Sequence, residues 1–391
     1  MRRMKGAAGL LTALLLAFQL SAQTFALANE DNGIKVVPVN FTHNGYSYEI
    51  EGVAKSTDGD YQMKSPARLA ARKLPSTYDP RSSGEITTVK DQASTGACWA
   101  FSALACAEQD LIKKGLENPS AGFSVPALVL SSNSGTATGK DDFSSGGNWL
   151  FAASALANGQ GLCYEDYEPF LESGTENMIV SENKKNVSEY RLNYVMELSS
   201  TTQVKRKIME LGAVSASYFA GNGYMNHNNT AYYDPDASKN TIINHSVTVV
   251  GWDDNYSKDN FRYKPANNGA WLVKGSWGAD QDNDGFYWVS YDEAEFGQFC
   301  CYDFEESCDN TYHYSKMTGY VVNASNDGSV YGANVFTAKA DEKLDKAGFM
   351  YVGKTGSADY TLSVYTDVSD SDPIGVLETQ ISGSVSANGF Y

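Results

Sequence analysis

The periodicity of apolar residues changes once along this chain of 391 residues, close to residue 306. Between Leu74 and about Glu306, helical patterns alternate with apolar strand-like segments, and few long linkers separate them. From about Asn310 onward, Gly, Ser, Thr, Asp and Tyr predominate, with short alternating runs such as the one at 360–365. Helices and strands require different periods. The sequence therefore predicts an α+β domain over 74–306 and an all-β module over 310–391.

The C-terminal module is expected to be sandwich-like. Its length of about 80 residues falls short of the roughly 100 residues of a typical β-sandwich. We therefore expect the module to be incomplete within this chain.

Residues 1–28 have the pattern of a secretory signal peptide. A basic start precedes the apolar stretch from Ala7 to Leu20, and the small residues Ala26 and Ala28 follow. A membrane anchor needs about 20 uninterrupted apolar residues, whereas polar residues interrupt this stretch. We expect cleavage after Ala28, a secreted, extracellular product and no membrane span in the mature chain.

Residues 29–73 are interpreted as a short leading or pro segment. The segment contains one strand-like alternation at 46–53 and ends with the pair Arg72-Lys73, which is either a processing site or a solvated helix end. It lacks the length and the helical heptads of a full inhibitory propeptide. Whether it inhibits the following domain stays open at this level.

The composition argues against one class of partner. The chain has 30 basic and 47 acidic residues, which give a net charge of −17. A nucleic-acid partner requires Lys and Arg side chains that neutralise phosphates. No nucleic-acid partner is therefore expected.

The most informative motif is the window 89–103, VKDQASTGACWAFSA. A glycine-containing turn at 94–96 precedes apolar residues at helical spacing, and Gly115 follows as a stop signal. This pattern places Cys98 in the first turn of a long apolar helix. There the helix dipole and the unpaired amides lower the pKa of a thiol, and the thiolate is the nucleophilic form. A buried structural cysteine is the alternative, and the turn and the nearby Gln92 argue against it.

Among the four histidines, His245 is the best candidate for a base. It lies near the start of INHSVTVVGWD at 243–253, where a β-branched alternation predicts a strand. A rigid strand can hold a histidine within hydrogen-bond reach of a thiol. A histidine buried in the core is the alternative.

Five segments occur in the order found in papain-like cysteine peptidases, and the chain resembles this family. The segments are LPSTYDPR at 74–81, the Cys98 window, GG at 146–147, INH at 243–245 and WLVKGSWG at 271–278. His245 lies 147 residues after Cys98, within the roughly 130 to 150 residues of papain-type arrangements. The resemblance implies a two-lobed fold with Cys98 on a mainly helical lobe, His245 on a β lobe, and a cleft between them.

The resemblance also implies roles for particular residues. Cys98 attacks the scissile carbonyl, His245 exchanges the proton, and Gln92 with the Cys98 amide stabilises the oxyanion. The implied activity is hydrolysis of protein or peptide substrates without a cofactor, and acyl transfer to an amine would use the same groups. The substrate-binding positions of the family fall on Gly146, Gly147, Trp149, Ser217, Ile243, Asn244, Ser246 and Trp277.

One departure from the family bears on activity. Gly275 stands where the family has the Asn that accepts the second ring N–H of the catalytic histidine. Glycine has no side chain for this role, although a water or a neighbouring residue can replace it. We expect hydrolysis about 10- to 100-fold slower than in a Gly275→Asn variant. The alternative is a catalytically impaired papain-fold protein that acts in cell-surface adhesion or peptide binding.

No metal site is expected. The cysteines beyond Cys98 match no common zinc pattern; a Cys301–Cys308 bridge and free thiols are the alternatives for them. The acidic run at 280–284 resembles the start of a calcium loop but has Tyr291 where the loop requires Glu. An acidic turn is the better interpretation of that run.

The C-terminal module resembles, more weakly, the lectin-like β domains appended to some bacterial papain-family peptidases. The resemblance depends on YGANVFTA at 331–338 and on the strand at 360–365. It implies a glycan or cell-wall ligand and association with the cell surface. A plain structural sandwich is the alternative, since no set of residues specifies a sugar.

Overall fold

The computed structural model describes most of the chain from residue 73 onward and three earlier strands. The described residues are 13–21, 35–43, 46–54, 73–132, 143, 146–157, 162–167, 169–170, 189–221, 223–237, 242–279, 284–308, 310–313, 329–353, 356–368 and 375–391. Residues 280–283 of the expected acidic turn, and Arg72, lie outside these ranges.

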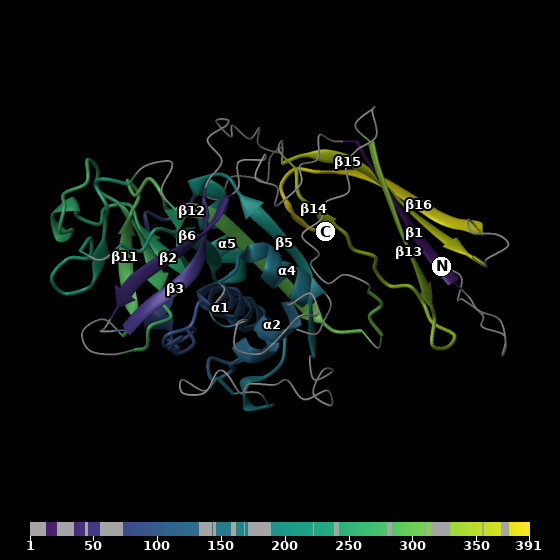
Figure 1. The fold of residues 1–391 in the computed structure, drawn as a ribbon, viewed down its shortest axis with the longest axis horizontal. Coiled ribbons are helices and arrows are strands. Elements are labelled where there is room, and N and C mark those ends of the chain that lie inside the picture. Colours follow the sequence, from purple (N-terminus) through teal and green to yellow (C-terminus); the bar gives the residue numbers. More distant parts are fainter. Residues whose placement is uncertain are drawn as a thin grey trace.

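A ten-stranded sheet forms the frame of the molecule (Figure 1). Its strand order is β14-β17-β5-β12-β6-β9-β10-β11-β7, and β4 pairs with β9. Every pairing in it is antiparallel except that of β11 with β7. The bounds are β4 Thr77–Tyr78, β5 Tyr190–Leu198, β6 Val214–Tyr218, β7 Ala231–Tyr232, β9 His245–Asp253, β10 Ala270–Lys274, β11 Phe286–Ser290, β12 Gly297–Glu306, β14 Met350–Tyr351 and β17 Gly389–Phe390.

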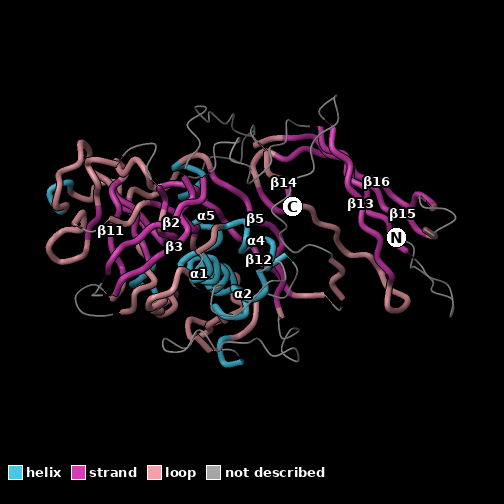
Figure 2. The backbone as a smooth tube through the Cα atoms, viewed as in Figure 1, coloured by secondary structure: helices cyan, strands magenta, loops and turns pink. Residues whose placement is uncertain are grey.

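The α-helices gather in the middle of the molecule (Figure 2). Helix α1 contacts β9 and β12 and also packs against α2 and α4. It begins at Cys98, and Gly115 with φ of 70° follows its end, as the glycine turn and the stop signal predicted. The bounds are α1 Cys98–Lys113, α2 Val125–Ser132, α4 Trp149–Ala157 and α5 Thr201–Leu211, with 3-10 helices η2 Pro80–Ser83, η3 Glu165–Tyr167 and η6 Lys258–Asn260.

Two hydrophobic cores divide this domain into the predicted two lobes. One core surrounds α1, α2 and α4 and includes Leu104 and Leu128. The other lies among β6, β9, β10, β11 and α5 and includes Val249 and Trp252. Strand β9 is buried at most of its positions, because α1, α5, β6 and β10 all contact it. The predicted α+β class is thereby confirmed.

The C-terminal module is all-β, as predicted, but it does not stand apart from the first domain. A four-stranded antiparallel sheet has the order β13-β1-β15-β16, with β13 Ser329–Thr337, β15 Ala358–Thr366 and β16 Val376–Val385. The module also places β14 and β17 in the main sheet, where Gly389 pairs with Met196 of β5. The module therefore shares the main sheet through β14 and β17, while β13, β15 and β16 lie in a separate sheet.

The segments before residue 73 contribute three strands. Strand β1, Ala13–Ser21, lies within the predicted signal peptide and pairs with both β13 and β15. A chain cleaved after Ala28 lacks this strand, which leaves the facing edges of β13 and β15 unpaired. Strands β2, Lys35–His43, and β3, Tyr46–Ala54, form a hairpin that confirms the predicted strand at 46–53.

Candidate active site

Cys98 lies where a turn becomes helix α1, and only 5% of it is exposed. Ala97 precedes it at the N-cap and supplies no side-chain cap. The thiol donates to the carbonyl oxygen of Gly96 at 3.9 Å, and backbone groups of Cys98, Trp99 and Ser246 lower its pKa. The sequence therefore places the sulfur among amides of the helix start, where a developing negative charge is stabilised.

The thiol nevertheless has a raised pKa in this structure. Burial raises the pKa of Cys98 to about 11, although the surrounding amides and Ser246 oppose the shift. The expectation of a lowered pKa is therefore wrong for the sulfur as it is covered here, because desolvation of the thiolate exceeds the stabilisation by the helix start. The neutral thiol is the form that predominates at neutral pH.

His245 opens strand β9 and lies directly opposite Tyr218 of β6 in the antiparallel ladder. Its exposed fraction is 2%. The indole of Trp277 stacks on the imidazole, with ring centroids 4.2 Å apart and planes inclined by 7°. The ring of Tyr218 meets the imidazole at a steep angle, with centroids 5.9 Å apart. These two aromatic rings restrict the orientation of the imidazole.

Cys98 and His245 line the same pocket, which is the central geometric result. The volume of this pocket is about 20 Å³, so it admits little more than one water molecule. Its lining joins the helical lobe to the β lobe, as the two-lobed arrangement requires. The remaining lining residues are Gly146, Gly147, Asn148, Ser217, Ile243, Asn244, Ser246 and Gln298.

Most of the predicted substrate-binding positions are therefore brought together. The exceptions are Trp149 and Trp277, neither of which lines the pocket; the indole of Trp277 instead stacks on the imidazole of His245. Trp149 begins α4, and its side chain forms a hydrogen bond with Glu197 of β5. The reason is that α4 packs against β5 and β17, so the start of this helix faces the main sheet.

Gly147 is a glycine because the backbone passes close to Trp99. A Cβ atom at this position would lie 2.5 Å from the indole Nε1 of Trp99. No ordinary side chain fits at such a distance, so the backbone of 147 stays bare on this side of the pocket. This observation supports the expectation that the main chain here is available to an extended substrate.

Gln92 is held by two side-chain hydrogen bonds. Its Nε2 donates to the carbonyl oxygen of Thr95 at 2.7 Å, and its Oε1 accepts from the hydroxyl of Ser276 at 2.6 Å. Its backbone amide also donates to the carbonyl oxygen of Ser276 at 2.7 Å. An amide nitrogen carries two hydrogens, so one of them is left for an oxyanion. The clamp fixes the orientation that a preorganised donor needs.

Two lining residues escaped the sequence analysis, namely Asn148 and Gln298. Asn148 is the residue after the glycine pair that the sequence analysis identified. Its side chain accepts a hydrogen bond from the backbone amide of Leu150. Gln298 has φ of 51° and sits where the β12–β6 register shifts. A strand irregularity of this kind has no signature in the sequence, because it depends on the pairing of distant strands.

The segment before residue 73 reaches the edge of this site. Strand β3 pairs with β8, Ile242–Ile243, through Val53↔Ile243 and Ala54↔Ile242. Ile243 lines the pocket and lies two residues before His245. The backbone edge of β8 is therefore occupied by the leading segment.

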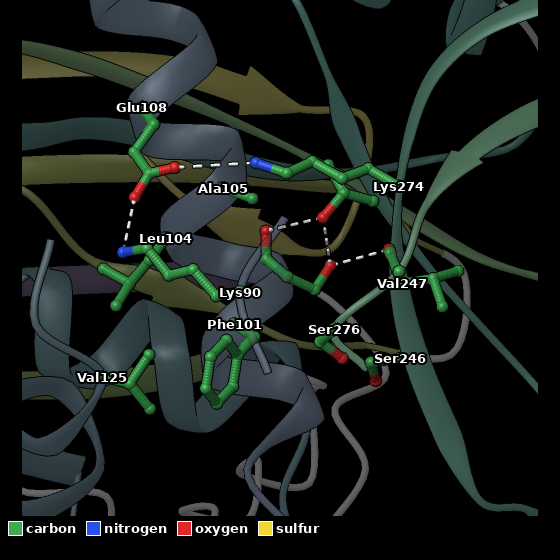
Figure 3. A pocket seen from close by; sticks show the side chains of 13 residues that line it. Lys90, Phe101, Leu104, Ala105, Glu108, Val125, Ser246, Val247, Lys274 and Ser276 are labelled. Atoms are coloured by element: carbon green, nitrogen blue, oxygen red, sulfur yellow. Dashed lines mark hydrogen bonds and ion pairs between the residues drawn. The ribbon is translucent and has the colours of Figure 1, made fainter. Parts of the chain in front are cut away.

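A buried ion cluster joins the two lobes beneath the site. Glu108 of α1, with an exposed fraction of 1%, contacts Lys90 at 3.0 Å and Lys274 at 3.9 Å and accepts from the Thr87 hydroxyl at 2.7 Å. Figure 3 shows both lysines pointing to this carboxylate. Although burial opposes its charged form, the two lysines hold the pKa of Glu108 below its usual value. The cluster ties the start of the Gly275–Trp277 segment to the Cys98 helix.

A Glu108→Ala variant is expected to have a free energy of unfolding about 3–5 kcal/mol below that of the wild type, because it leaves Lys274 buried without its counter-charge and removes one of the two carboxylates that contact Lys90. Denaturant unfolding of the purified chains measures the difference. Glu165→Ala is the matched control, since Glu165 also contacts Lys90, at 2.9 Å, but is partly exposed. A loss below about 1 kcal/mol is expected there, and equal losses in both variants would contradict the proposed importance of burial.

The described part of the chain contains no disulfide, and all six cysteines are free. Cys301 lies in the sheet with its thiol near the Met196 carbonyl, so of the two alternatives free thiols are observed. Among the described residues, no group of three or more His, Cys, Asp or Glu side chains is arranged to hold a metal ion. Nor does any described helix combine the length and the apolar character needed to cross a bilayer.

A cysteine at a helix start and a histidine at the start of a strand line one pocket, the arrangement that a cysteine nucleophile with a neighbouring base requires. Comparison with known proteins assigns the family. The papain family cysteine protease profile matches residues 74–329, and the lectin like domain profile matches residues 311–391. The chain belongs to the papain family of cysteine proteases.

Individual relatives agree with this assignment. Procathepsin L of Felis catus is 29% identical over 223 residues, which is 56% of this chain and 61% of that protein. Cathepsin K of Mus musculus is 24% identical over 216 residues, or 55% and 59% of the two chains. The chain thus spans about six tenths of the length of these curated relatives.

A solved structure matches both domains together. The cysteine protease and lectin-like domains of Cwp84, a surface layer associated protein of Clostridium difficile, superpose with a TM-score of 0.66 at 26% sequence identity. The match covers 84% of this chain and 72% of that chain. The combination of a papain-like domain with a lectin-like module is therefore shared.

Proposed function

We propose that this chain is a secreted cysteine endopeptidase that hydrolyses peptide bonds through an acyl-enzyme at Cys98. The observation that carries the proposal is the common pocket of Cys98 and His245, lined on one side by Gly147 and on the other by Asn244 and Ser246. Family membership supplies the second support. Metal and cofactor have no part in the proposed reaction.

The proposed reaction has two stages. In the first, His245 accepts the Cys98 proton while the sulfur bonds to the carbonyl carbon, and the oxyanion accepts hydrogen bonds from Gln92 and the Cys98 amide. The carbon–nitrogen bond then breaks, and the imidazolium gives its proton to the leaving amine. In the second stage a water attacks the thioester, with His245 as the base, and the thiol is restored.

Gly275 is proposed to weaken this activity relative to family members that have Asn there. The proposal rests on the missing side chain, since only the backbone of 275 is available, and its amide donates to the Gly285 carbonyl at 3.0 Å. Export is proposed from the signal-like pattern of residues 1–28. Association with the cell surface, and a glycan or cell-wall ligand for the C-terminal module, are proposed from the likeness to Cwp84, a surface layer associated protein.

Reaction of the full chain with a peptidyl epoxide tests the enzymatic proposal. We expect one equivalent of reagent to remove cleavage of a peptide library, read by mass spectrometry, and the adduct to map to Cys98. Two observations motivate the rival of a non-catalytic peptide-binding or adhesion protein: Gly275 and the raised pKa of Cys98. Labelling spread evenly over the cysteines, with no cleavage at any concentration, would favour that rival.

Removal of the leading segment is expected to activate the thiol. A chain beginning at Leu74 loses the β3 strand that pairs beside Ile243, so water reaches the sulfur more readily and its pKa falls from about 11 toward the usual value. Each unit of decrease raises the thiolate fraction at pH 7 about tenfold. We expect iodoacetamide to alkylate Cys98 at least about tenfold faster than in a chain beginning at Asn29.

Cys308 is an internal control for that measurement, since it is partly exposed and lies outside the site. Its alkylation rate is expected to be equal in the two chains. Equal rates at Cys98 as well would show that the leading segment does not cover the sulfur.

A further inference from the structure

The region beside Gly275 is occupied by an aromatic side chain from the neighbouring strand. Position 275 opposes Gly285 across the β10–β11 hairpin, because the amide of 275 donates to the carbonyl of 285, and Tyr287 pairs with Val273. Residues 275 and 287 are therefore diagonal neighbours of the ladder, within reach of an aromatic ring. A Cβ atom at 275 would lie 3.4 Å from Cε1 of Tyr287 and 3.2 Å from the Gly285 oxygen.

Gly275 is thus not required by its own backbone conformation, since it is absent from the residues of positive φ in the described chain. Instead, the Tyr287 side chain favours glycine at position 275. A Cβ atom alone is just accommodated there, whereas the amide group of an asparagine has to compete with the Tyr287 ring for space. The loss of a side chain at 275 and the presence of a large one at 287 are complementary.

Tyr287 is connected to His245 through a second tyrosine. The hydroxyl groups of Tyr287 and Tyr218 form a hydrogen bond of 2.9 Å. Tyr218 opposes His245 in the β6–β9 ladder, and its ring edge packs at 5.9 Å from the imidazole. Both tyrosines are buried, with exposed fractions of 3% and 1% for Tyr287 and Tyr218. A phenylalanine pair would fill the same volume without two hydroxyl groups to desolvate.

Tyr287 is a neutral phenol. Burial raises its pKa, and a negative charge on Cys98 would add to that increase. The imidazole also stacks on the indole of Trp277. It is therefore in contact with two aromatic rings, the indole and the ring of Tyr218.

We propose that Tyr287 and Tyr218 are positioning residues, whose hydrogen-bonded phenols replace the missing Asn side chain at 275 and hold His245 toward Cys98. This inference rests on the proposed peptidase function. It assigns the third position of the catalytic arrangement to two residues of β6 and β11 that lie in none of the family motifs quoted above.

The inference makes the effect of an asparagine at 275 depend on residue 287. Gly275→Asn alone is expected to be no faster than wild type, because Tyr287 occupies the required space. This replaces the gain of about 10- to 100-fold that the sequence alone predicts for that variant. Tyr287→Phe is expected to lower kcat about 10- to 100-fold with little change in KM, the scale of a displaced catalytic group. In the Tyr287→Val background, Gly275→Asn is expected to raise kcat at least about tenfold.

This dependence is measured by comparing the kcat of the wild type, Gly275→Asn, Tyr287→Val and the double variant Gly275→Asn/Tyr287→Val. Tyr287→Phe is added in case the valine variants do not fold. Tyr302→Phe is the matched control, because Tyr302 is also buried but belongs to the other core, and its kcat is expected to equal that of wild type. An effect of asparagine that is the same in both backgrounds, or a wild-type kcat for Tyr287→Phe, overturns the inference. Cleavage that survives Cys98→Ala overturns the proposed function instead, so the two failures are distinguishable.

Discussion

The Cys98→Ala variant is expected to have a kcat roughly 10⁴- to 10⁶-fold below that of the wild type, the scale seen when a nucleophile is removed from an acyl-transfer site. No other described cysteine lines the pocket that contains His245, so no second thiol takes its place. The alanine side chain fits in the same buried position. Initial rates on a peptide identified by library cleavage measure the change.

Cys106→Ala is the control for the loss of a thiol from the same helix. Cys106 is fully buried in the helical lobe, so this variant is expected to lose some stability and to keep its kcat. If Cys98→Ala retains more than about a hundredth of wild-type activity, a different group is the nucleophile, and the peptidase proposal in its present form is refuted.

The sequence predicted those parts of the site that depend on local signals. Helix α1 follows from a glycine turn, apolar spacing and a glycine stop, all within the stretch from 94 to 115. The strand of His245 follows from a β-branched run. Cys98 and His245 each lie at the start of an element that the sequence predicted. Predicting the helix and the strand correctly therefore also placed these two residues, and both line one pocket.

Features that depend on the packing of distant segments were not predictable. The pKa of Cys98 is set by how completely the sulfur is covered, and that depends on every segment that closes over the site. The start of α4 faces β5 and not the pocket, which removes Trp149 from the lining. Strands β14 and β17 have two residues each, too few for any periodicity to reveal that they join the main sheet.

The Tyr287–Gly275 relation illustrates the same boundary. Both residues were in view in the sequence, one in the GSWG motif and one in the following strand. Their proximity requires the register of the β10–β11 hairpin, which pairs Val273 with Tyr287. Without that register, Gly275 indicates only that the Asn side chain of the family is missing. With the register, it is also clear that Tyr287 lies beside position 275.

The His245→Ala variant is expected to lose about 10²- to 10⁴-fold in kcat, the range for removal of a general acid–base group. The reason is specific to this site: burial holds the Cys98 thiol neutral, with a pKa of about 11, so the sulfur depends on a neighbouring base to become nucleophilic. The alkylation rate of Cys98 at pH 7 is therefore expected to fall together with kcat.

His227→Ala is the control, because this histidine is exposed in a turn and does not line the pocket. It is expected to match the wild type in both measurements. If the start of α1 alone generated the thiolate, His245→Ala would cleave peptides slowly but its Cys98 would be alkylated as fast as in the wild type. That pattern would restrict His245 to protonation of the leaving amine and would remove it as the base that generates the thiolate.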